Sequence, residues 1–497
     1  MRIRVSTILK TVAFVCAATV AVQASALVLK SKESDYKYAD FFDKAKAGQI
    51  DVLFIGSSHV INGINPATLY KEYGITSYNM GGHGAVMQET YWMLKEALNY
   101  CTPKCVVVDT FMLQKNYQYL DVMSEEYTDE DRESSIGQLH QNMDCWPLDD
   151  TKVAAIEDLI SSREIRKQFL VPFYIYHNRW EELDANDYKV LTGTGDRNTL
   201  FGAEMRYGME LRPGIYPGPD DDQGLGGDTV GEKYLVKIID ECQNRGIDVI
   251  TTFLTCSATT EDKRAMDSVR IICDTYDVPF VNMQNLGVVD LYTDLNDTGH
   301  MNALGSIKAS MCIGEVLQDM GTLQDHRGDL AYMDWQDKSE EFYETIRELA
   351  VSSDNIYQQL DYLTSGSVSS VIYINENSQA FWDDQMKRLI HNFSGTPNIY
   401  HTRGPYVLIN DVASGVVSEA SGKDTLDGVK TGLGTVHYEP VEQLFRLFYT
   451  DENPDFNYLY ADDKYEYDIQ IITYDKDTGE ILSHNYYKSY GSNYTKG

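Results

Sequence analysis

The stretch Asp51-Val-Leu-Phe-Ile-Gly-Ser-Ser-His59 joins a short apolar run to a turn that carries two serines. A continuous apolar run of this length is typical of a strand covered on both faces, as the strands of parallel sheets are. The turn then places Ser58 at the carboxyl end of that strand. A serine hydroxyl is a weak nucleophile until a base takes its proton. The stretch therefore predicts a parallel-sheet strand and Ser58 as a candidate nucleophile.

Strand and helix patterns alternate along the first two thirds of the chain. Asn65-Pro66 and Asn302 are typical helix starts, because asparagine caps a helix and proline fits its first turn. Strands are expected at 51–55, 75–79, 105–109, 247–253 and 279–282, and helices at 66–73, 87–100, 232–245, 260–276 and 303–320. Such alternation predicts an α/β fold, with a parallel sheet between two layers of helices.

The sequence suggests several further segments around this core. Residues 1–30 form a targeting segment, and 31–324 form the α/β domain. Within that domain a loop-rich, acidic and aromatic insertion is expected at about 113–229. A helical connector at 325–364 leads to a smaller α+β accessory domain at 365–497. The clearest element of that domain is a hairpin of 469–474 with 481–487.

The N-terminus has the composition of a targeting signal. Arg2, Arg4 and Lys10 precede an almost uniformly apolar run from 11 to 29. Ala24-Ser25-Ala26 matches a signal-peptidase site, which favours a cleaved secretory signal. The run is also long enough to remain as a membrane anchor. Both alternatives predict an extracytoplasmic protein, either membrane-anchored or secreted.

The overall charge limits the class of partner. The 497 residues carry a formal net charge of −34, which repels nucleic-acid phosphates, so nucleic acid is excluded as a partner. An acidic surface with 36 tyrosines suits neutral or cationic glycans. The eight cysteines are scattered without the spacing of a disulfide framework. Cys101 and Cys105 lack partners at metal spacing, and neither a metal nor a cofactor is expected.

A second stretch, Asp297-Thr-Gly-His300, supplies what an activated serine needs. A histidine base takes the serine proton, and an acid holds the imidazole in the correct tautomer. The spacing lets one loop carry both groups. Ser58, His300 and Asp297 therefore form a candidate triad, typical of an esterase or acyltransferase.

Three motifs together resemble those of the SGNH (GDSL-type) hydrolases. They are Gly56-Ser-Ser-His59, Asn79-Met-Gly-Gly-His-Gly84 and Asp297-Thr-Gly-His300. The resemblance covers about 51–320, apart from the insertion. It implies a three-layer, flavodoxin-like sheet with Ser58 as nucleophile, His300 as base and Asp297 as acid. It also implies an oxyanion hole formed by the backbone amides of Ser58 and Gly84.

One motif of that family is missing. A Gly-x-Asn-Asp block is expected after the strand at 105–109, but Thr110-Phe-Met-Leu-Gln114 stands there. The family's asparagine donor to the oxyanion is therefore unassigned, with Asn116 as the nearest substitute. Loss of one such donor costs about 10²- to 10³-fold in rate.

Other polar residues are candidates for substrate contact or for structural roles. His59 lies beside the candidate nucleophile, without an acidic partner at useful spacing. His177 and Arg179 lie in an aromatic part of the insertion. Each of the three is assigned to substrate binding, with a structural role as the alternative.

Within the family, the chain looks most similar to the membrane-anchored, extracytoplasmic branch. That branch includes the D-alanyl-transfer proteins of teichoic-acid modification and the exopolysaccharide O-acetyltransferases. The resemblance implies a serine esterase or O-acyltransferase acting on acyl esters of cell-surface polysaccharide or another acylated glycan. A multipass membrane acyltransferase is a further partner in such systems. The alternative is a non-catalytic glycan-binding protein on a decayed scaffold.

Overall fold

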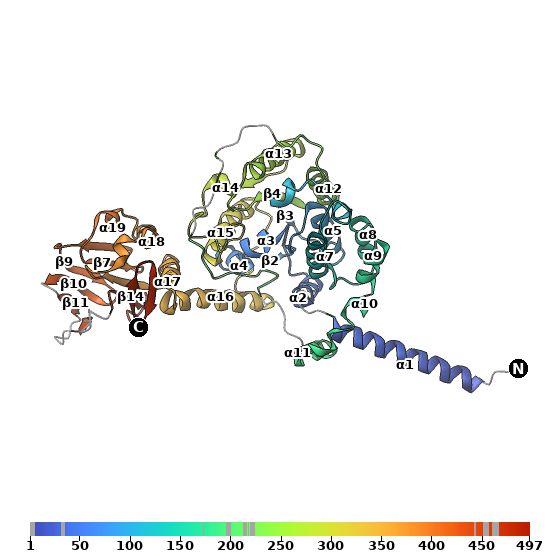
Figure 1. The fold of residues 1–497 in the computed structure, drawn as a ribbon, viewed down its shortest axis with the longest axis horizontal. Coiled ribbons are helices and arrows are strands. Elements are labelled where there is room, and N and C mark those ends of the chain that lie inside the picture. The colour runs from blue at the N-terminus through green and yellow to red at the C-terminus, as the bar shows by residue number, and fades with distance from the viewer. Residues whose placement is uncertain are drawn as a thin grey trace. The chain divides into compact units, whose positions relative to one another are not determined.

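The computed structural model describes residues 5–30, 35–171, 173–194, 200–211, 216, 218, 224–441, 444–450, 457–459 and 467–497. The chain divides into two compact units, Met1–Lys338 and Ser339–Gly497. The division falls inside helix α16 (Met333–Ser352), within the segment expected as a connector. Figure 1 shows the ribbon of both units.

The first unit is built on a parallel sheet of five strands. The strands are β1 (Val52–Ile55), β2 (Ser77–Asn79), β3 (Cys105–Asp109), β4 (Asp248–Phe253) and β5 (Phe280–Asn282). Their order is β2-β1-β3-β4-β5, and every neighbouring pair is parallel. The α/β class is therefore confirmed, and the order is that of flavodoxin-like doubly wound sheets. The carboxyl ends of all five strands meet at one edge.

Helices cover both faces of this sheet (Figure 1). They are α4 (Pro66–Tyr73), α5 (Met87–Ala97), α12 (Val230–Asn244), α13 (Thr260–Tyr276) and α15 (Ala303–Asp319). Successive side chains of a strand point to opposite faces, so β1 contributes to two separate apolar clusters. Leu53 and Ile55 pack with α5, α12 and α13, whereas Val52 and Phe54 pack with α4 and α15.

The local sequence explains where these helices begin. The side chain of Asn65 caps α4, and Pro66 is its first residue. The side chain of Asn302 caps α15 by accepting from the Gly305 amide. Reciprocal bonds of Thr229 with Glu232 form a capping box at α12. The helix starts expected from the sequence at Pro66 and after Asn302 are therefore confirmed.

The insertion differs from its predicted character. It was expected to be rich in loops, and that expectation is wrong for much of the described part. The structure has α6 (Tyr119–Val122), α7 (Asp129–Met143), α8 (Asp150–Leu159), α9 (Arg163–Leu170), α10 (Phe173–Tyr176) and α11 (Ala185–Lys189). Capping side chains at Thr128, Asp149 and Ser162 start three of these helices. These capping residues are the local sequence signal for the start of a helix. The apolar periodicity of the insertion is harder to recognise, because its helices contain many acidic and aromatic residues.

Two helices precede β1, and one long helix follows the sheet. Helix α1 (Val5–Leu29) is long and apolar enough to cross a membrane, as a signal or as an anchor. Helix α2 (Asp35–Lys46) packs Phe41 into the cluster around α5. At the start of α16, Trp335 is fully buried and stacks on Phe201, with ring centroids 3.5 Å apart. The first turn of α16 therefore belongs to the core of the first unit.

The remaining short helices of the first unit are α3 (Ser58–Gly63), η1 (Phe111–Gln114), η2 (Arg179–Glu181), η3 (Val190–Thr192), α14 (Met283–Leu286) and η4 (Leu330–Tyr332). Helix α3 follows β1 directly, and η1 follows β3. Both therefore lie at the carboxyl edge of the sheet.

The second unit is a separate antiparallel structure. One sheet has six strands in the order β15-β14-β13-β6-β7-β8, and another has four in the order β12-β11-β10-β9. The strands are β6 (Ser369–Ile374), β7 (Tyr406–Asp411), β8 (Val416–Ser421), β9 (Leu426–Thr431), β10 (Gly434–Val441), β11 (Leu444–Thr450), β12 (Asn457–Leu459), β13 (Ile469–Tyr474), β14 (Ile481–Tyr490) and β15 (Asn493–Lys496). The helices are α17 (Ile356–Leu363), η5 (Gln379–Trp382), α18 (Asp384–Ser394) and α19 (Asn398–His401). The expected hairpin forms between β13 and β14.

Candidate active site

Ser58 is placed by the turn between β1 and α3. Gly56 has φ +150°, and a Cβ built on it would lie 2.7 Å from Val60 and 2.9 Å from Asp109. Only glycine fits such a close approach. Ser57 then caps α3 by accepting from the His59 amide at 3.3 Å, and Ser58 is the first residue of the helix. The turn therefore presents the Ser58 hydroxyl at the carboxyl edge of the sheet.

Asp297 and His300 lie on one short loop before α15. A single antiparallel bridge joins Leu295 to Met301 and closes the loop. Oδ1 of Asp297 accepts the backbone amides of Gly299 and His300, each at 2.9 Å. These bonds fix the Asp297 carboxylate within its own loop. The position of Asp297 relative to His300 is therefore set by the loop backbone.

The structure brings the three predicted triad residues together. Oγ of Ser58 lies 2.9 Å from Nε2 of His300, and Nδ1 of His300 lies 2.8 Å from Oδ1 of Asp297. With a proton on Nδ1 donated to Asp297, Nε2 is left to accept from the serine hydroxyl. Burial opposes ionisation of Asp297, but the Gly299 amide and the His300 ring outweigh it and lower the pKa of Asp297. The arrangement is the one that general-base activation of a serine requires.

Arg206 is a component of the site that the sequence did not indicate. Its Nη1 donates to Oδ2 of Asp297 at 2.7 Å, on the oxygen that faces away from the backbone amides. The Arg206 side chain is about two fifths exposed, at 39%. The Arg206 carbonyl also accepts the Ala303 amide at 2.7 Å, which ties its segment to the start of α15. No local pattern signals this residue, because 91 positions separate it from Asp297.

The predicted substrate-contact residues fall into two groups. His59 stacks on Phe111 of η1, with ring centroids 3.6 Å apart, and its ring centroid lies 5.4 Å from that of His300. Burial lowers the pKa of His59 to about 3, so the ring stays neutral. His177 and Arg179 have different contacts: Nδ1 of His177 pairs with the Tyr174 carbonyl, and Arg179 binds the end of α1. Only His59 is joined to the triad by a contact.

Gly84, predicted as an oxyanion donor, lies in a loop folded against the nucleophile turn. The Gly82 amide donates to the Gly56 carbonyl at 2.9 Å. Gly84 has φ +59°, a conformation that favours glycine. Among the described residues no acceptor takes the Gly84 amide. The Ser58 amide is at the first position of α3, where helix geometry provides no partner.

Asn142 of α7 holds the peptide that carries the Gly84 amide. Its Oδ1 accepts from the His83 amide and its Nδ2 donates to the His83 carbonyl, both at 2.8 Å. In a trans peptide the carbonyl of one residue and the amide of the next point in opposite directions. The bond to the His83 carbonyl therefore also fixes the direction of the Gly84 N–H.

Two further side chains hold Asn142 and the Gly84 loop in this position. Asn142 Nδ2 donates to Oε1 of Glu89 at 2.7 Å, and the Tyr119 hydroxyl donates to Oε2 of Glu89 at 2.5 Å. The same hydroxyl lies 3.3 Å from the Gly84 carbonyl, so the loop is held on both sides of Gly84. Burial raises the pKa of Glu89 to about 7 against these hydrogen bonds. Tyr119 and Asn142 come from the insertion, whose role in shaping the loop the sequence could not show.

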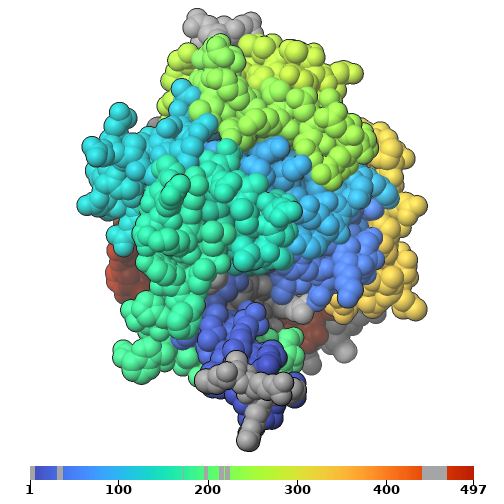
Figure 2. Space-filling model, turned by 90° about the vertical axis from the view of Figure 1, so that its right-hand side faces the viewer, coloured from blue at the N-terminus to red at the C-terminus, as the bar shows by residue number. Residues whose placement is uncertain are grey.

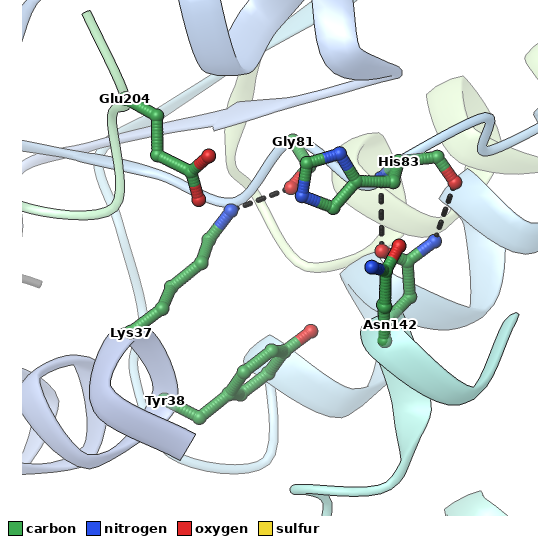
Figure 3. A pocket seen from close by; sticks show the side chains of 7 residues that line it. Lys37, Tyr38, Gly81, His83, Asn142 and Glu204 are labelled. Carbon is green, nitrogen blue, oxygen red and sulfur yellow. Dashed lines mark hydrogen bonds between the residues drawn. The ribbon is translucent and has the colours of Figure 1, made fainter. Parts of the chain in front are cut away.

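A small cavity of about 30 Å³ lies beside the loop that carries Gly84, with Gly81 and His83 in its lining (Figure 3). Nζ of Lys37 donates to the Gly81 carbonyl at 2.5 Å, and Figure 3 shows its side chain directed towards Glu204. Burial lowers the pKa of Lys37 to about 8, although Glu204 opposes the shift. The carbonyls of Gly81, His83 and Gly84 are thus each bound by a side chain from a different element.

The segment after β3, where the SGNH resemblance predicts a third oxyanion donor, has other residues. Helix η1 follows β3, and its Phe111 stacks on His59. Asn116, the nearest candidate from the sequence, is exposed and accepts the Val230 amide at 3.0 Å, at the start of α12. Its side chain is therefore engaged away from the triad, and the suggestion that Asn116 replaces the donor finds no support.

The site is a Ser-His-Asp arrangement at the carboxyl edge of a parallel α/β sheet. Among the residues that the structure describes, no group of histidine, cysteine or acidic side chains could hold a metal ion. None of the eight cysteines forms a disulfide. No family model matches the chain, and no curated protein matches it. The inference of function therefore depends on the geometry of the site.

Proposed function

We propose that the chain is an extracytoplasmic serine esterase or O-acyltransferase of the SGNH type. The observation that carries the proposal is the continuous hydrogen-bonded line from Ser58 through His300 to Asp297, at 2.9 and 2.8 Å. The strand order and the position of the serine after β1 support the family assignment. The apolar helix α1 supports a location at or beyond a membrane.

The first half of the proposed reaction forms an acyl-enzyme. Oγ of Ser58 attacks the acyl carbonyl while Nε2 of His300 accepts the hydroxyl proton. Asp297 stabilises the imidazolium, and the amides of Ser58 and Gly84 donate to the oxyanion. When the tetrahedral intermediate collapses, the bond to the alcohol breaks and His300 returns the proton to the leaving oxygen.

The second half releases the acyl group. Water or a sugar hydroxyl approaches the ester carbonyl of Ser58, and His300 removes its proton. Attack by water gives a carboxylic acid, whereas attack by a sugar gives a new ester. The serine regains its proton in both cases. Acyl esters of cell-surface polysaccharide fit the proposal, because a chain with net charge −34 favours a neutral substrate over a polyanion.

A non-catalytic glycan-binding protein is the second candidate. It is favoured by one observation: η1 and the stacked pair Phe111 and His59 stand where the family places its third oxyanion donor. A scaffold that had lost catalysis could retain the triad as a polar cluster. The two candidates differ in whether Ser58 is reactive.

Covalent labelling with a fluorophosphonate tests the proposal. The chain from about residue 31 is incubated with the probe beside Ser58→Ala and His300→Ala, and the labelled peptide is identified by mass spectrometry. We expect label on Ser58, and its loss in both variants. His177→Ala is the matched histidine control, because its Nδ1 pairs with the Tyr174 carbonyl and not with a triad residue, and it should label normally. A folded wild-type chain that takes no label would favour the glycan-binding candidate.

A further inference from the structure

A group of large apolar side chains is exposed on the short helices that follow α9. These elements are α10, η2, α11 and η3. We call their exposed members the anchor-side patch: Phe173 (40%), Tyr174 (48%), Trp180 (65%), Tyr188 (54%) and Leu191 (51%). Single exposed apolar side chains are ordinary on a protein surface, but a concentration of them marks a contact surface.

The structure joins this patch to the C-terminal end of α1. Helix α1 contacts α10, α11 and η3. Nη1 of Arg179 donates to the carbonyls of Leu29 at 2.8 Å and Lys30 at 2.5 Å, and Nη2 donates to Asp187 at 2.9 Å. A cation on the last carbonyls of a helix is favourable, because those groups have no partner within the helix. In Figure 2 the dark-blue atoms of α1 lie beside green atoms of this part of the chain.

The length of α1 sets the level of the patch relative to a bilayer. The apolar segment Ser6–Leu29 has 24 residues. At about 1.5 Å per residue it spans roughly 36 Å, slightly more than a hydrocarbon core of about 30 Å. A helix that crosses the bilayer therefore has Leu29 at the boundary with water. Trp180 follows Arg179, whose side chain binds the Leu29 carbonyl, so the backbone that carries the indole lies about one side-chain length from that boundary.

The side chains of the anchor-side patch are of the types found at the boundary between hydrocarbon and lipid headgroups. Tryptophan and tyrosine are favoured where hydrocarbon meets lipid headgroups, because each ring has an apolar body and a polar end. The charge of the segment is compatible with this level: α10 to η3 carry two basic and four acidic side chains, and together with α9 residues 163–194 carry five of each, in a chain with net charge −34. A neutral segment approaches lipid headgroups without the repulsion that the rest of this acidic surface experiences.

We propose that the anchor-side patch lies in the headgroup layer of the bilayer that α1 crosses. The occupant of this surface is lipid, and the patch is a second membrane contact beside the spanning helix. Arg179 is then a structural residue that joins the two contacts. The patch is independent of the proposed chemistry at Ser58, so either proposal can fail alone.

Tryptophan quenching on the full chain tests this proposal. The chain has five tryptophans; Trp180 is 65% exposed and Trp382, in the second unit, is 62% exposed. The protein is reconstituted into phosphatidylcholine nanodiscs whose acyl chains are brominated close to the headgroup. We expect bromolipid to quench part of the emission, and Trp180→Phe to remove that part. Trp382→Phe is the matched control and should leave the quenching unchanged.

Two results would overturn the proposal. One is bromolipid quenching that is the same in Trp180→Phe as in the wild type. The other is aqueous iodide reaching Trp180 in nanodiscs as readily as it reaches Trp382. Either result would mean that the patch faces water in a pure lipid bilayer, and would favour a protein partner as its occupant. Phenylalanine keeps the apolar ring, and both tryptophans are exposed, so neither substitution should prevent folding.

Discussion

At Gly84 one residue combines a backbone requirement with a role in the proposed chemistry. Its φ is +59°, and a Cβ built there would lie 2.1 Å from Oε1 of Gln138. The clash involves the end of a flexible side chain, whereas the backbone strain cannot be relieved by a neighbour. Conformation and space are therefore separate constraints, and only the second can be removed by substituting Gln138.

Gly84→Ala should slow fluorophosphonate labelling of Ser58 by about 100-fold, because the oxyanion donor is displaced. The strained φ should also lower the free energy of unfolding by about 1–2 kcal/mol. Gln138→Ala should label at the wild-type rate, and the double variant should recover part of the loss by removing the clash. Labelling rates are measured beside chemical denaturation. Unchanged labelling in Gly84→Ala would remove Gly84 from the oxyanion hole.

Glu89 gives the stability of the protein a specific pH dependence. Burial raises its pKa from 4.5 to about 7, so between these values the folded state holds a proton that the unfolded state releases. Its contribution to stability is present below pH 4.5 and is lost as the pH rises through about 7. Glu89→Gln should remove this dependence, so that the variant gains up to about 3 kcal/mol on the wild type over that interval. Denaturant unfolding at several pH values measures the difference; a constant difference would contradict the assignment.

Among the elements, α7 affects the site indirectly, through Asn142. It lies in the insertion, yet its Asn142 binds both polar groups of His83 and also Glu89. Removing this side chain takes a donor from Oε1 of the buried Glu89 and from the partly buried His83 carbonyl, whereas Oε2 of Glu89 keeps the Tyr119 hydroxyl; each buried group left unsatisfied costs about 1–3 kcal/mol. Asn142 thus positions the Gly84 amide, which the proposed function uses as an oxyanion donor.

Asn142→Ala should slow labelling of Ser58 by about 10-fold or more, because the His83–Gly84 peptide is free to rotate. Asn116→Ala is the matched control: it loses only the bond to the Val230 amide at the start of α12, and should label at the wild-type rate. The rate is measured per folded molecule, using circular dichroism to count folded protein. Equal rates in the two variants would leave Asn142 with a purely structural role.

The sequence predicted those elements whose signals are local. Apolar runs marked β1 and β3, and the caps at Asn65 and Asn302 marked two helices. Ser58, Asp297 and His300 were recognisable as candidates because the two stretches that carry them, Gly56-Ser-Ser-His59 and Asp297-Thr-Gly-His300, are short and contiguous. Arg206 and Asn142 were not, since each acts on a residue far away in the chain. The strands β8 and β9 were missed because few apolar residues alternate in them, whereas β10, with Val436 and Tyr438 in alternation, and the largely apolar β11 did have a local signal.

At the scale of the whole molecule, the boundary between the two units has a physical basis. The contacts divide the chain after Lys338, and Trp335 lies fully buried between Phe201 and Tyr70. Lys44 of α2 also pairs with Asp334 at 2.5 Å. The first unit is therefore incomplete without the beginning of α16, although the sequence placed the end of the domain at residue 324.

A chain of residues 31–338 should keep Ser58 labelling, whereas a chain of 31–324 should be much less stable. Loss of a buried tryptophan costs about 3–5 kcal/mol. For a unit of this size that corresponds to a melting temperature lower by roughly 10 °C. Differential scanning fluorimetry of both chains measures the shift. Equal melting temperatures would show that the Trp335 contacts do not stabilise the first unit.

The hydrogen bond between Ser58 and His300 joins residues that are 242 positions apart. During synthesis at about 5–20 residues per second, the serine leaves the ribosome roughly 10–50 s before its base. Throughout that interval it is an ordinary alcohol, because the adjacent His59 has no acidic partner at useful spacing to make it a substitute for His300. In a chain interrupted before residue 300, the Ser58 hydroxyl has no histidine base to accept its proton. If Ser58 is the nucleophile proposed above, labelling by a serine-directed probe counts only molecules in which residues 58 and 300 have been joined by folding of the first unit.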